Sequence, residues 1–338
     1  MTVGEKIAKR PKVLDGLHLG LPNYWYPILS ASALGDRPVC VRRFGKDLAV
    51  WRDAAGRPRV LDNNCPHRGA PLSEGTVRGD TLACAYHGWR FDAAGQCVEM
   101  PLEPEDSPRP ARIRTAAYPA EERGGYVWMF YGAAEKAGPL EIPEEVADED
   151  WLSFRADYDW QTNWLNILDN VLDPLHAIHL HTGAATQRNR ARFQRFEVTR
   201  DDERGFRLGK IGHRPDGSIG AVEGEVEFVL PNLLRLDIAD GTPEGLYRVV
   251  IMPTPVDAGA SCAFYVRARR GRGRRRLAWR LWWARYGRAV QRVAEQDRLI
   301  LSQIAPIGEA RLREHLVSSD VGVIHLRKRL NRSFYGED

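Results

Sequence analysis

Short apolar runs separated by turn-forming residues dominate residues 38–132. Val39–Phe44 and Leu48–Trp51 flank the turn-forming stretch Gly45–Asp47, which predicts a β-hairpin. Tyr126–Tyr131 follows two glycines and has the apolar character of a closing strand. This half of the chain is therefore predicted to be all-β.

A proline-rich and acidic stretch, from about residue 133 to residue 150, separates this half from the next. Domain boundaries usually fall in segments of this kind. We therefore expect an N-terminal arm over residues 1–21, a β-rich domain over 22–135, a linker over 136–150 and a second domain over 151–338.

The second domain is predicted to be α+β. Between Asn163 and about His181, apolar residues recur at helical spacing: Trp164, Ile167, Leu168, Val171 and Leu175. Several strand-like runs follow, and the short turns between them favour an antiparallel sheet over βαβ units. These runs include Glu225–Leu230, Leu233–Ile238, Leu246–Met252 and Cys262–Arg269. A long helix, from about Arg276 to Ile304, is expected after the sheet.

The composition is that of a globular protein with room for two domains. The chain has 338 residues, of which 43% are hydrophobic and 28% charged. No apolar run is long enough to span a membrane, and the start, from Met1 to Val13, is polar and basic, unlike a secretory signal. Five cysteines spread over so long a chain are a poor disulfide framework, which fits a reducing compartment and favours a cytoplasmic location.

Eight arginines fall between Arg267 and Arg280, although the net charge of the chain is only +4. Such a run is most often a solvated loop that leads into a helix. Docking of an acidic redox partner and peripheral contact with an anionic membrane are the other interpretations. Trp279, Trp282 and Trp283 beside the run fit either a membrane contact or the core. Nucleic-acid binding is not expected, because nothing else in the chain supports it.

Two pairs of metal-ligating residues lie in turn-rich loops: Cys65 with His67, and Cys84 with His87. Thiolates on one iron and neutral imidazoles on the other suit a mixed-ligand [2Fe–2S] cluster. A structural zinc site is the alternative, but a zinc finger normally places its two cysteines before its two histidines. The pattern here favours the cluster. The other cysteines are expected to be packed or incidental thiols: Cys40, Cys97 and Cys262.

Three further histidines crowd together at His176, His179 and His181. Activation of O₂ at Fe(II) uses two imidazoles and one carboxylate on one face of the metal. On an ideal helix His176 and His179 share a face, whereas His176 and His181 lie about 140° apart. Pro174 should disturb the helix, however, and Gly183 should end it, so that His181 lies on a frayed last turn. Spacing alone leaves the choice of two histidines open.

Asp297 is the natural source of the carboxylate. It lies within an apolar stripe of the predicted late helix, together with Val290, Val293, Ala294, Leu301 and Ile304. An unpaired carboxylate on the buried face is strongly unfavourable, and a bound cation would offset that cost. Pairing of Asp297 with a neighbouring arginine is the alternative interpretation, and Glu295 is the second choice as ligand.

At the first motif the chain resembles the Rieske family. The similarity extends beyond the four ligands, through Cys65–Leu72 and Cys84–Phe91. Rieske proteins of respiratory and photosynthetic complexes carry one more cysteine in each loop, and these pair as a disulfide. Ala70 and Tyr86 lie close to those positions here. The chain is therefore more similar to the oxygenase branch of the family.

The histidine cluster resembles the catalytic domain of Rieske non-haem iron oxygenases. Their pattern Asn-x-x-Asp-x-x-His-x₄-His is met by Asn170, Asp173, His176 and His181. The resemblance thus selects His176 and His181 as iron ligands and leaves His179 in the second shell or facing solvent. The segment Glu295–Arg298 also resembles the late ligand motif of these enzymes, with Asp297 as the third ligand.

The resemblance also gives Asp173 a role. In the family this residue joins an iron-ligand histidine to a cluster-ligand histidine across a subunit contact. Asp173 would then accept hydrogen bonds from His176 and from His87 of a neighbouring subunit, and such partners orient imidazoles. An N-terminal cap ahead of Pro174 is the simpler role for Asp173, and both roles are compatible.

The resemblance covers most of the chain and implies a β-rich Rieske domain, a helix-grip catalytic domain and a head-to-tail homotrimer. The electrons would come from NAD(P)H through a separate flavin reductase or ferredoxin, since the sequence has no nucleotide-binding glycine motif. The end of the chain looks most similar to the pheophorbide a oxygenase-like group and the saxitoxin-pathway hydroxylases. That similarity implies hydroxylation, or oxidative demethylation, of a small organic substrate.

Three alternatives stay open. An arene cis-dihydroxylating dioxygenase would use the same two metal sites. An electron-transfer Rieske protein would lack the second iron site, and a ligand-binding sensor with a helix-grip pocket would not need Asp297 on a buried face. The pocket is expected on the inner face of the sheet between Phe193 and Tyr265, but the substrate is not encoded in any motif.

Overall fold

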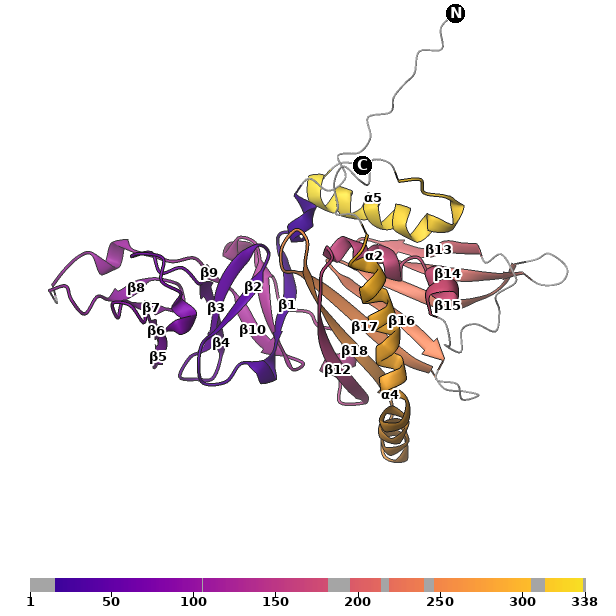
Figure 1. The fold of residues 1–338 in the computed structure, drawn as a ribbon, viewed down its shortest axis with the longest axis horizontal. Helices are drawn as coiled ribbons and strands as arrows, with labels where there is room; N and C mark the ends of the chain where they lie inside the picture. The colour runs from indigo at the N-terminus through magenta and orange to yellow at the C-terminus, as the bar shows by residue number, and fades with distance from the viewer. Residues whose placement is uncertain are drawn as a thin grey trace, which may run out of the picture.

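The computed structural model describes residues 16–104, 106–181, 195–213, 219–239, 246–304 and 314–336. Small sheets lie at one end of the molecule and a large sheet with helices lies at the other (Figure 1). Gly183, the expected end of the helix, and Phe193, the expected start of the pocket-lining sheet, fall outside the described residues.

The first part is built from three antiparallel sheets, which confirms its all-β character. The first sheet has the order β1 (Tyr24–Ser30), β11 (Tyr126–Tyr131) and β10 (Ala120–Arg123). The second sheet has the order β2 (Val39–Arg43), β3 (Lys46–Arg52), β4 (Pro58–Asp62) and β9 (Ala117–Tyr118). The third sheet has the order β5 (Thr76–Arg78), β6 (Thr81–Ala83), β7 (Arg90–Asp92) and β8 (Cys97–Glu99).

The predicted hairpin joins β2 to β3. Its two loop residues, Phe44 and Gly45, have φ values of 55° and 71°, as the favoured two-residue hairpin turn requires. A positive φ is costly for phenylalanine. The Phe44 ring is buried and stacks on Tyr131, with ring centroids 4.1 Å apart. Burial of this ring between the sheets stabilises the turn.

A single seven-stranded antiparallel sheet forms the centre of the second part, as predicted. Its order is β12 (Trp151–Trp160), β18 (Ser261–Arg270), β17 (Leu246–Pro255), β16 (Leu233–Ala239), β15 (Ile219–Val229), β14 (Gly205–His213) and β13 (Arg195–Asp202). β12 was not predicted as a strand. It pairs along its whole length with β18, so the first and last strands of this sheet in the sequence are neighbours in space.

The two faces of this sheet are covered by different parts of the chain. Side chains alternate between faces along a strand. On β18, Phe264 and Val266 pack in one hydrophobic cluster with Tyr126 of the first part, while Ala263 and Tyr265 pack in another cluster that includes the helices. The sheet is therefore sandwiched between the first part and the helical layer, and β17 and β18 are buried on both sides over most of their length.

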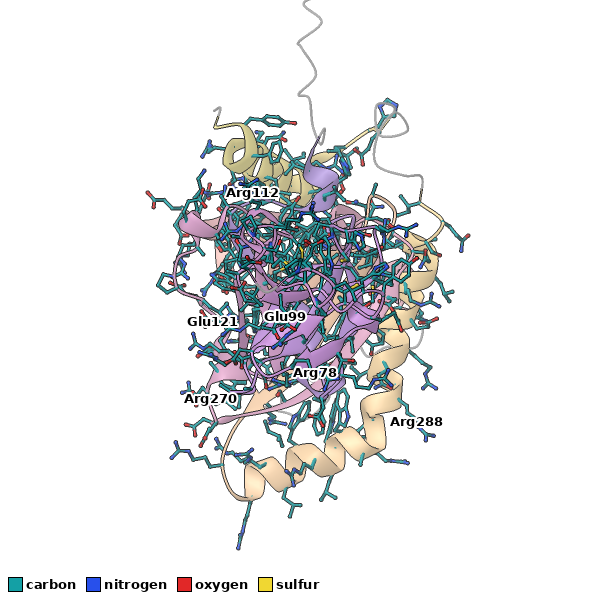
Figure 2. The ribbon with its side chains drawn as sticks, turned by 90° about the vertical axis from the view of Figure 1, so that its left-hand side faces the viewer. Arg78, Glu99, Arg112, Glu121, Arg270 and Arg288 are labelled. Atoms are coloured by element: carbon teal, nitrogen blue, oxygen red, sulfur yellow. The ribbon has the colours of Figure 1, made fainter. Side chains whose placement is uncertain are left out.

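Helices α2 (Trp164–Val171), α3 (His176–Leu180) and α4 (Arg274–Leu301) belong to the second part, and α5 (Val321–Tyr335) follows near the C-terminus. The first two occupy the segment predicted as one helix, and the break falls around Pro174, where a disturbance was expected. α4 agrees with the predicted long helix, whereas α5 was not predicted. Figure 2 shows that α4 is bent, so that its two halves run in different directions.

The tryptophans at the start of α4 pack inward. Trp279 is buried against the sheet, and Trp282 and Trp283 are half-buried against the same hydrophobic cluster. They therefore give no support to a membrane contact. Most of the arginines around them are exposed, as a solvated run would be, and Arg270 projects outward from the ribbon (Figure 2). None of the described helices combines the length and the apolarity that crossing a bilayer requires.

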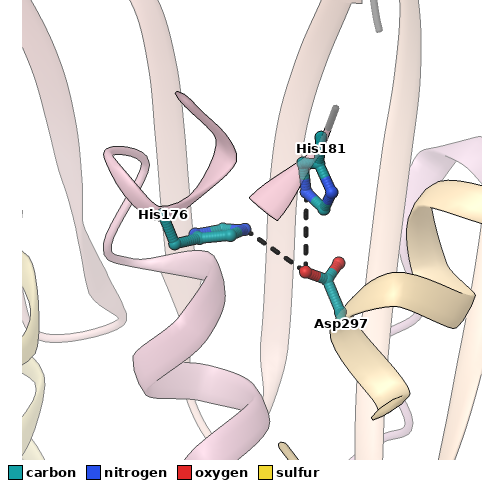
Figure 3. A group of neighbouring side chains, drawn as sticks. All are labelled: His176, His181 and Asp297. Carbon is teal, nitrogen blue, oxygen red and sulfur yellow. Dashed lines mark ion pairs between the residues drawn. The ribbon is translucent and has the colours of Figure 1, made fainter. Parts of the chain in front are cut away.

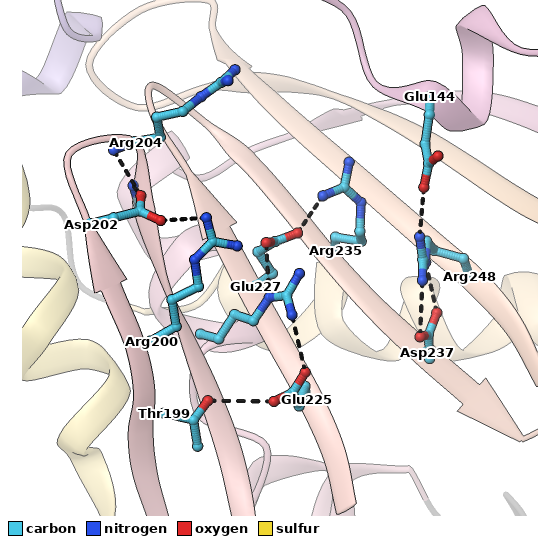
Figure 4. Close-up of polar contacts among 12 residues, drawn as sticks. Glu144, Thr199, Arg200, Asp202, Arg204, Glu225, Glu227, Arg235, Asp237 and Arg248 are labelled. Atoms are coloured by element: carbon cyan, nitrogen blue, oxygen red, sulfur yellow. Dashed lines mark hydrogen bonds and ion pairs between the residues drawn. The ribbon is translucent and has the colours of Figure 1, made fainter.

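The expected linker contains a short helix, α1 (Glu144–Ala147), that packs on the sheet. Glu145 on this helix is buried and contacts two arginines of the sheet, with Oε1 2.7 Å from Arg235 Nε and 3.1 Å from Arg248 Nη1. Glu227 pairs with Arg235, and Asp237 and Glu144 pair with Arg248 (Figure 4). This ion network fixes the segment that joins the two parts.

Candidate functional site

The two loops that carry the expected cluster ligands have the same backbone geometry. In each, the cysteine N–H donates to the carbonyl five residues later, and the glycine N–H four residues later donates back to the cysteine carbonyl. The second bond closes a tight turn in both loops. Gly69 and Gly88 hold the turns with φ values of 73° and 71°, a conformation that glycine adopts without steric cost. The repeat of cysteine, histidine and glycine thus folds into two matching loops.

The cysteines of these loops point inward and the histidines outward. Cys65 is only 2% exposed and packs with Cys84 in a hydrophobic cluster. His67 is exposed and His87 is half-buried, and their ring centroids lie 4.5 Å apart. Thiols on one side and imidazoles on the other are what a cluster with two ligand types needs. The four residues therefore fit a [2Fe–2S] centre whose histidine-bound iron is nearer the solvent.

Burial has an electrostatic effect on the thiols. It raises the pKa of Cys65 to about 11, and the adjacent Cys84 thiol acts in the same direction. Thiolates at such a position need a cation. Trp89 stacks on the His67 ring with centroids 4.4 Å apart and thereby orients this imidazole. This role of Trp89 was not predicted from the sequence, although Trp89 directly follows the second loop glycine.

All five cysteines are free thiols in the structure. Cys97 and Cys262 are buried, and Cys40 is exposed with its sulfur 3.3 Å from Asn63 Nδ2. None of these three is among the side chains of the paired loops, in agreement with their expected role as packed or incidental thiols.

The second site depends on the break between α2 and α3. Asn163 caps α2 by accepting a hydrogen bond from the backbone of Leu165, and α2 ends before Asp173. The Asp173 side chain then accepts a bond from the N–H of Leu175, which makes it a cap for the next turn, as the simpler interpretation predicted. His181 is the residue that directly follows α3. Because it lies outside the helix, the His181 side chain can turn toward His176.

His176, His181 and Asp297 converge on one point (Figure 3). Asp297 Oδ1 lies 3.4 Å from His176 Nε2 and 3.5 Å from His181 Nε2. Ligand atoms that share a metal at bond lengths near 2.1 Å are about 3 Å apart when they are neighbours in its coordination sphere. The three side chains therefore have the spacing of a two-histidine, one-carboxylate metal site with one face left open.

The outer ring nitrogens of both histidines are held by oxygen acceptors. His176 Nδ1 contacts the backbone carbonyl of Asp173, and His181 Nδ1 lies 3.2 Å from Gln296 Oε1. Each contact favours the tautomer with the proton on Nδ1, so both Nε2 lone pairs are directed at Asp297. The His176 contact corrects one expectation, because its acceptor is the carbonyl of Asp173 and not the carboxylate. Gln296 was missed, although it directly precedes Asp297.

Asp297 is 8% exposed, and its Oδ1 accepts no hydrogen bond within the part of the chain that the structure describes. A buried carboxylate oxygen without a hydrogen bond is costly. The arginine pairing considered as an alternative is absent from the described contacts of Asp297, since nearby Arg298 pairs with Glu295 at 2.5 Å. Burial favours the neutral imidazole of His176, but Asp297 outweighs burial and raises the pKa of His176. Both groups fit a bound cation.

A pocket of about 690 Å³ opens beside His176 on the outer side of α3. Asn170 and Asp173 line it together with His179, which is exposed. The far wall comes from the end of α4 and the segment before α5. Burial raises the pKa of Asp173, and His176 offsets this only in part. The two residues expected beside the ligands thus lie where the second site reaches the surface.

Each part of the chain matches a known protein family. Residues 24–119 match the Rieske [2Fe-2S] domain, and residues 160–334 match the vanillate O-demethylase oxygenase C-terminal domain. The chain belongs to the Rieske oxygenase family. Its fold is similar to that of dicamba monooxygenase, with a TM-score of 0.74 over 93% of this chain and 97% of that one, at 22% identity.

Two relatives show the range of this oxygenase family. The 4beta-methylsterol monooxygenase of Methylococcus capsulatus is 39% identical over 47% of this chain and 45% of its own length. The oxygenase subunit of phthalate 4,5-dioxygenase from Pseudomonas putida is 32% identical over 72% of this chain and 58% of its own length. The match thus spans about half the length of these relatives.

Proposed function

We propose that the protein is the terminal component of an oxygenase system, which uses O₂ and electrons from a partner protein to hydroxylate, or oxidatively demethylate, a small organic substrate. The observation that carries the proposal is the buried Asp297 oxygen facing His176 and His181. A chain that only transferred electrons would need the cysteine and histidine loops alone. A ligand-binding sensor would have no use for a buried carboxylate in this position.

In this proposal Cys65, His67, Cys84 and His87 hold the [2Fe–2S] cluster. His176, His181 and Asp297 hold a mononuclear Fe(II), and Asp173 and Asn170 act beside it. The bound iron would supply the site at which O₂ is activated. The protein's part is to fix both imidazoles through their Nδ1 contacts, to keep one face of the site open and to shield it from water behind α4.

The arrangement of the two sites supports a homotrimer. The loops with the cluster ligands lie at the end of the molecule that carries β5–β8, far from α2 and α4 in Figure 1. Electron transfer between the sites of one chain would have to cross the whole molecule. We therefore propose that His87 of a neighbouring subunit contacts Asp173 at the pocket beside His176. That contact would use the Asp173 carboxylate, while its carbonyl already holds His176.

Electrons would reach the cluster through its exposed histidine side, where a ferredoxin or a flavin reductase supplied by NAD(P)H could dock. The domain extents proposed above fit this division of labour, with residues 22–135 as the electron-receiving domain and 151–338 as the catalytic one. A cytoplasmic location is part of the proposal, because five cysteines without a disulfide fit a reducing compartment.

Relatives named as monooxygenases and as dioxygenases are both present, so family membership leaves the reaction type open. We favour monooxygenation over arene cis-dihydroxylation, on the strength of the sequence similarity to the hydroxylase branch described above.

The test is to measure iron and acid-labile sulfide per chain after anaerobic purification and reconstitution with ferrous iron. We expect about three irons for two sulfides in the wild-type protein and about two in Asp297→Asn and His176→Ala. Glu295→Gln is the matched control, because Glu295 is two residues away on the same helix and pairs with Arg298 at the surface. It should retain all three irons.

Two outcomes would contradict the proposal. About two irons for two sulfides in the wild-type protein would leave an electron carrier without an oxygenase site. Equal iron in Asp297→Asn and Glu295→Gln would remove Asp297 from the set of ligands, even if a second iron were present.

A further inference from the structure

One arginine of the basic run lies inside the protein. Arg267 on β18 is 2% exposed, whereas the sequence pattern placed it in a solvated loop. Alternation along β18 places Arg267 on the same face of the sheet as Ala263 and Tyr265, which is the face covered by the helices. The candidate metal site, formed by α3 and α4 with His181, belongs to this helical side as well. Arg267 is therefore a buried cation on the catalytic side of the sheet.

Aromatic rings surround the Arg267 guanidinium. Its Cζ lies 4.9 Å from the ring centroid of Tyr265, 5.8 Å from that of Tyr158 and 5.9 Å from that of Trp283. Rings at such distances attract a cation. They do not, however, accept hydrogen bonds from the five N–H groups that lie in the plane of the guanidinium group. In the described part of the chain, Nη1 has no hydrogen-bond partner, and no carboxylate pairs with this guanidinium.

A buried arginine without an anion is energetically unfavourable, because the charge has lost its water and gained no counter-charge. The neighbouring polar atoms show the same deficit. The hydroxyl of Tyr158 and the indole Nε1 of Trp160 are buried and lack hydrogen-bond partners among the described residues. Both rings pack on Tyr265, with centroid distances of 5.2 and 6.2 Å. Three unsatisfied donors thus gather around one tyrosine.

Tyr265 links this group to the helix that carries Asp297, because it packs in one hydrophobic cluster with Ala294, which precedes Asp297 by one turn of α4. Burial is the main cause that raises the pKa of Tyr265, and the charge of Asp297 raises it further while Arg267 lowers it. The phenol is therefore within electrostatic range of both charges.

We propose that Arg267 binds the carboxylate of the substrate, with Tyr158 and Trp160 as further donors and with the rings of Tyr265 and Trp283 against an apolar body. The substrate class is then a small aromatic or alicyclic carboxylic acid. A carboxylate matches the planar fork of arginine with two parallel hydrogen bonds. This assignment rests on the proposed function for the reaction, but the binding site itself is formed by residues outside the metal ligands.

The test is the affinity of the anaerobic holoenzyme for three acids and their uncharged amides, followed by tryptophan fluorescence. The probes are benzoate, phenylacetate and cyclohexanecarboxylate, each beside benzamide, phenylacetamide or cyclohexanecarboxamide. At least one acid should bind about tenfold or more tightly than its amide, as expected for a charge-assisted pair in a buried site. Arg267→Met should abolish this preference, and Arg267→Lys should retain part of it. Arg270→Met, an exposed arginine of the same run, is the control and should behave as wild type.

The proposal is overturned if no acid is preferred over its amide by the wild-type protein, or if Arg267→Met retains the preference. Circular dichroism and the cluster absorbance report folding of each variant. Should Arg267→Met not fold, the wild-type protein and Arg267→Lys decide the question alone. Iron content is measured on the same samples to separate the two proposals. If the wild-type protein binds no mononuclear iron, the proposed oxygenase function is refuted. A preference for acids over amides in the same protein would still establish the anion site.

Discussion

Replacement of Glu145 by glutamine should destabilise the protein strongly, because Glu145 is the buried centre of the ion network that joins α1 to the sheet. Its carboxylate receives three hydrogen bonds from two arginines, two from Arg235 and one from Arg248. Glutamine keeps one acceptor oxygen but presents an NH₂ group to the Arg235 fork. One hydrogen bond from Arg235 is thus lost, the other two are weakened because the acceptor is no longer charged, and two donors come to face each other.

The expected loss can be worked out from these contacts. Hydrogen bonds to charged groups contribute about 1.5–3 kcal/mol each, and breaking a buried pair costs about 3–5 kcal/mol. Arg235 retains Glu227 and Arg248 retains Asp237, which moderates the effect. We therefore expect a loss of about 2–4 kcal/mol in the free energy of unfolding. At about 2–4 °C per kcal/mol for a domain of this size, the melting temperature should fall by roughly 4–16 °C.

The neighbouring Glu144 provides a matched control. It pairs with the same Arg248 nitrogen at 3.1 Å, but its side chain is 50% exposed whereas that of Glu145 is 0% exposed. Glu144→Gln should cost less than about 1 kcal/mol, as exposed ion pairs do. Urea unfolding followed by tryptophan fluorescence, with thermal melts beside it, measures both variants. Equal losses in the two variants, or a loss below about 1 kcal/mol for Glu145→Gln, would refute the reasoning from burial.

Three further predictions concern single residues. Burial alone would raise the pKa of Glu227, but its two arginine partners outweigh burial and hold this pKa below its usual value. The contribution of ionised Glu227 to the stability of the folded protein is therefore complete above the unfolded-state pKa of about 4.3. It is lost as the pH falls through the lower folded-state pKa. Glu227→Gln should therefore lower stability at neutral pH and flatten its decline in acid, as urea midpoints from pH 7 to pH 3 would report; an unchanged slope would contradict this. Gly88→Ala should lower cluster occupancy, because φ is +71° and the new Cβ would lie 3.1 Å from Pro101. Visible absorbance and acid-labile sulfide measure the occupancy. Gly56→Ala is the control and should leave the occupancy unchanged, because Gly56 has a φ of +76° but open space around it. His179→Ala should retain the second iron and His181→Ala should lose it, and the reverse result would exchange the two histidines as ligands.

Much of the candidate site could be predicted because its signals are local or periodic. The cysteine and histidine loops are short motifs, and their shape depends on backbone bonds within six residues. Asp297 was found because a charged residue stands out in an apolar helical stripe. The choice of His181 over His179 needed the family resemblance, since it depends on where α3 ends, and helix ends are poorly encoded in spacing alone.

The parts that were missed depend on contacts between distant segments. β12 is an edge strand of the sheet, and its exposed positions include Arg155 and Asp157. They face the first part of the chain, where Arg155 lies over the Tyr126 ring and Asp157 accepts a hydrogen bond from Ser30. Arg267 was misjudged for the same reason, because it was grouped with the exposed arginines that follow it and only the pairing of β18 shows that it is buried.

The matching loops around Cys65 and Cys84 have a consequence for how the protein is maintained. Each loop is closed by its own backbone hydrogen bonds, so its shape does not depend on the metal in the way that a zinc finger does. The domain that carries them also has a hydrophobic core of its own, centred on Trp51. A chain that loses its cluster to oxidation should therefore remain folded and keep the four ligand side chains in place. Insertion of a new cluster should then restore the protein without synthesis of a new chain.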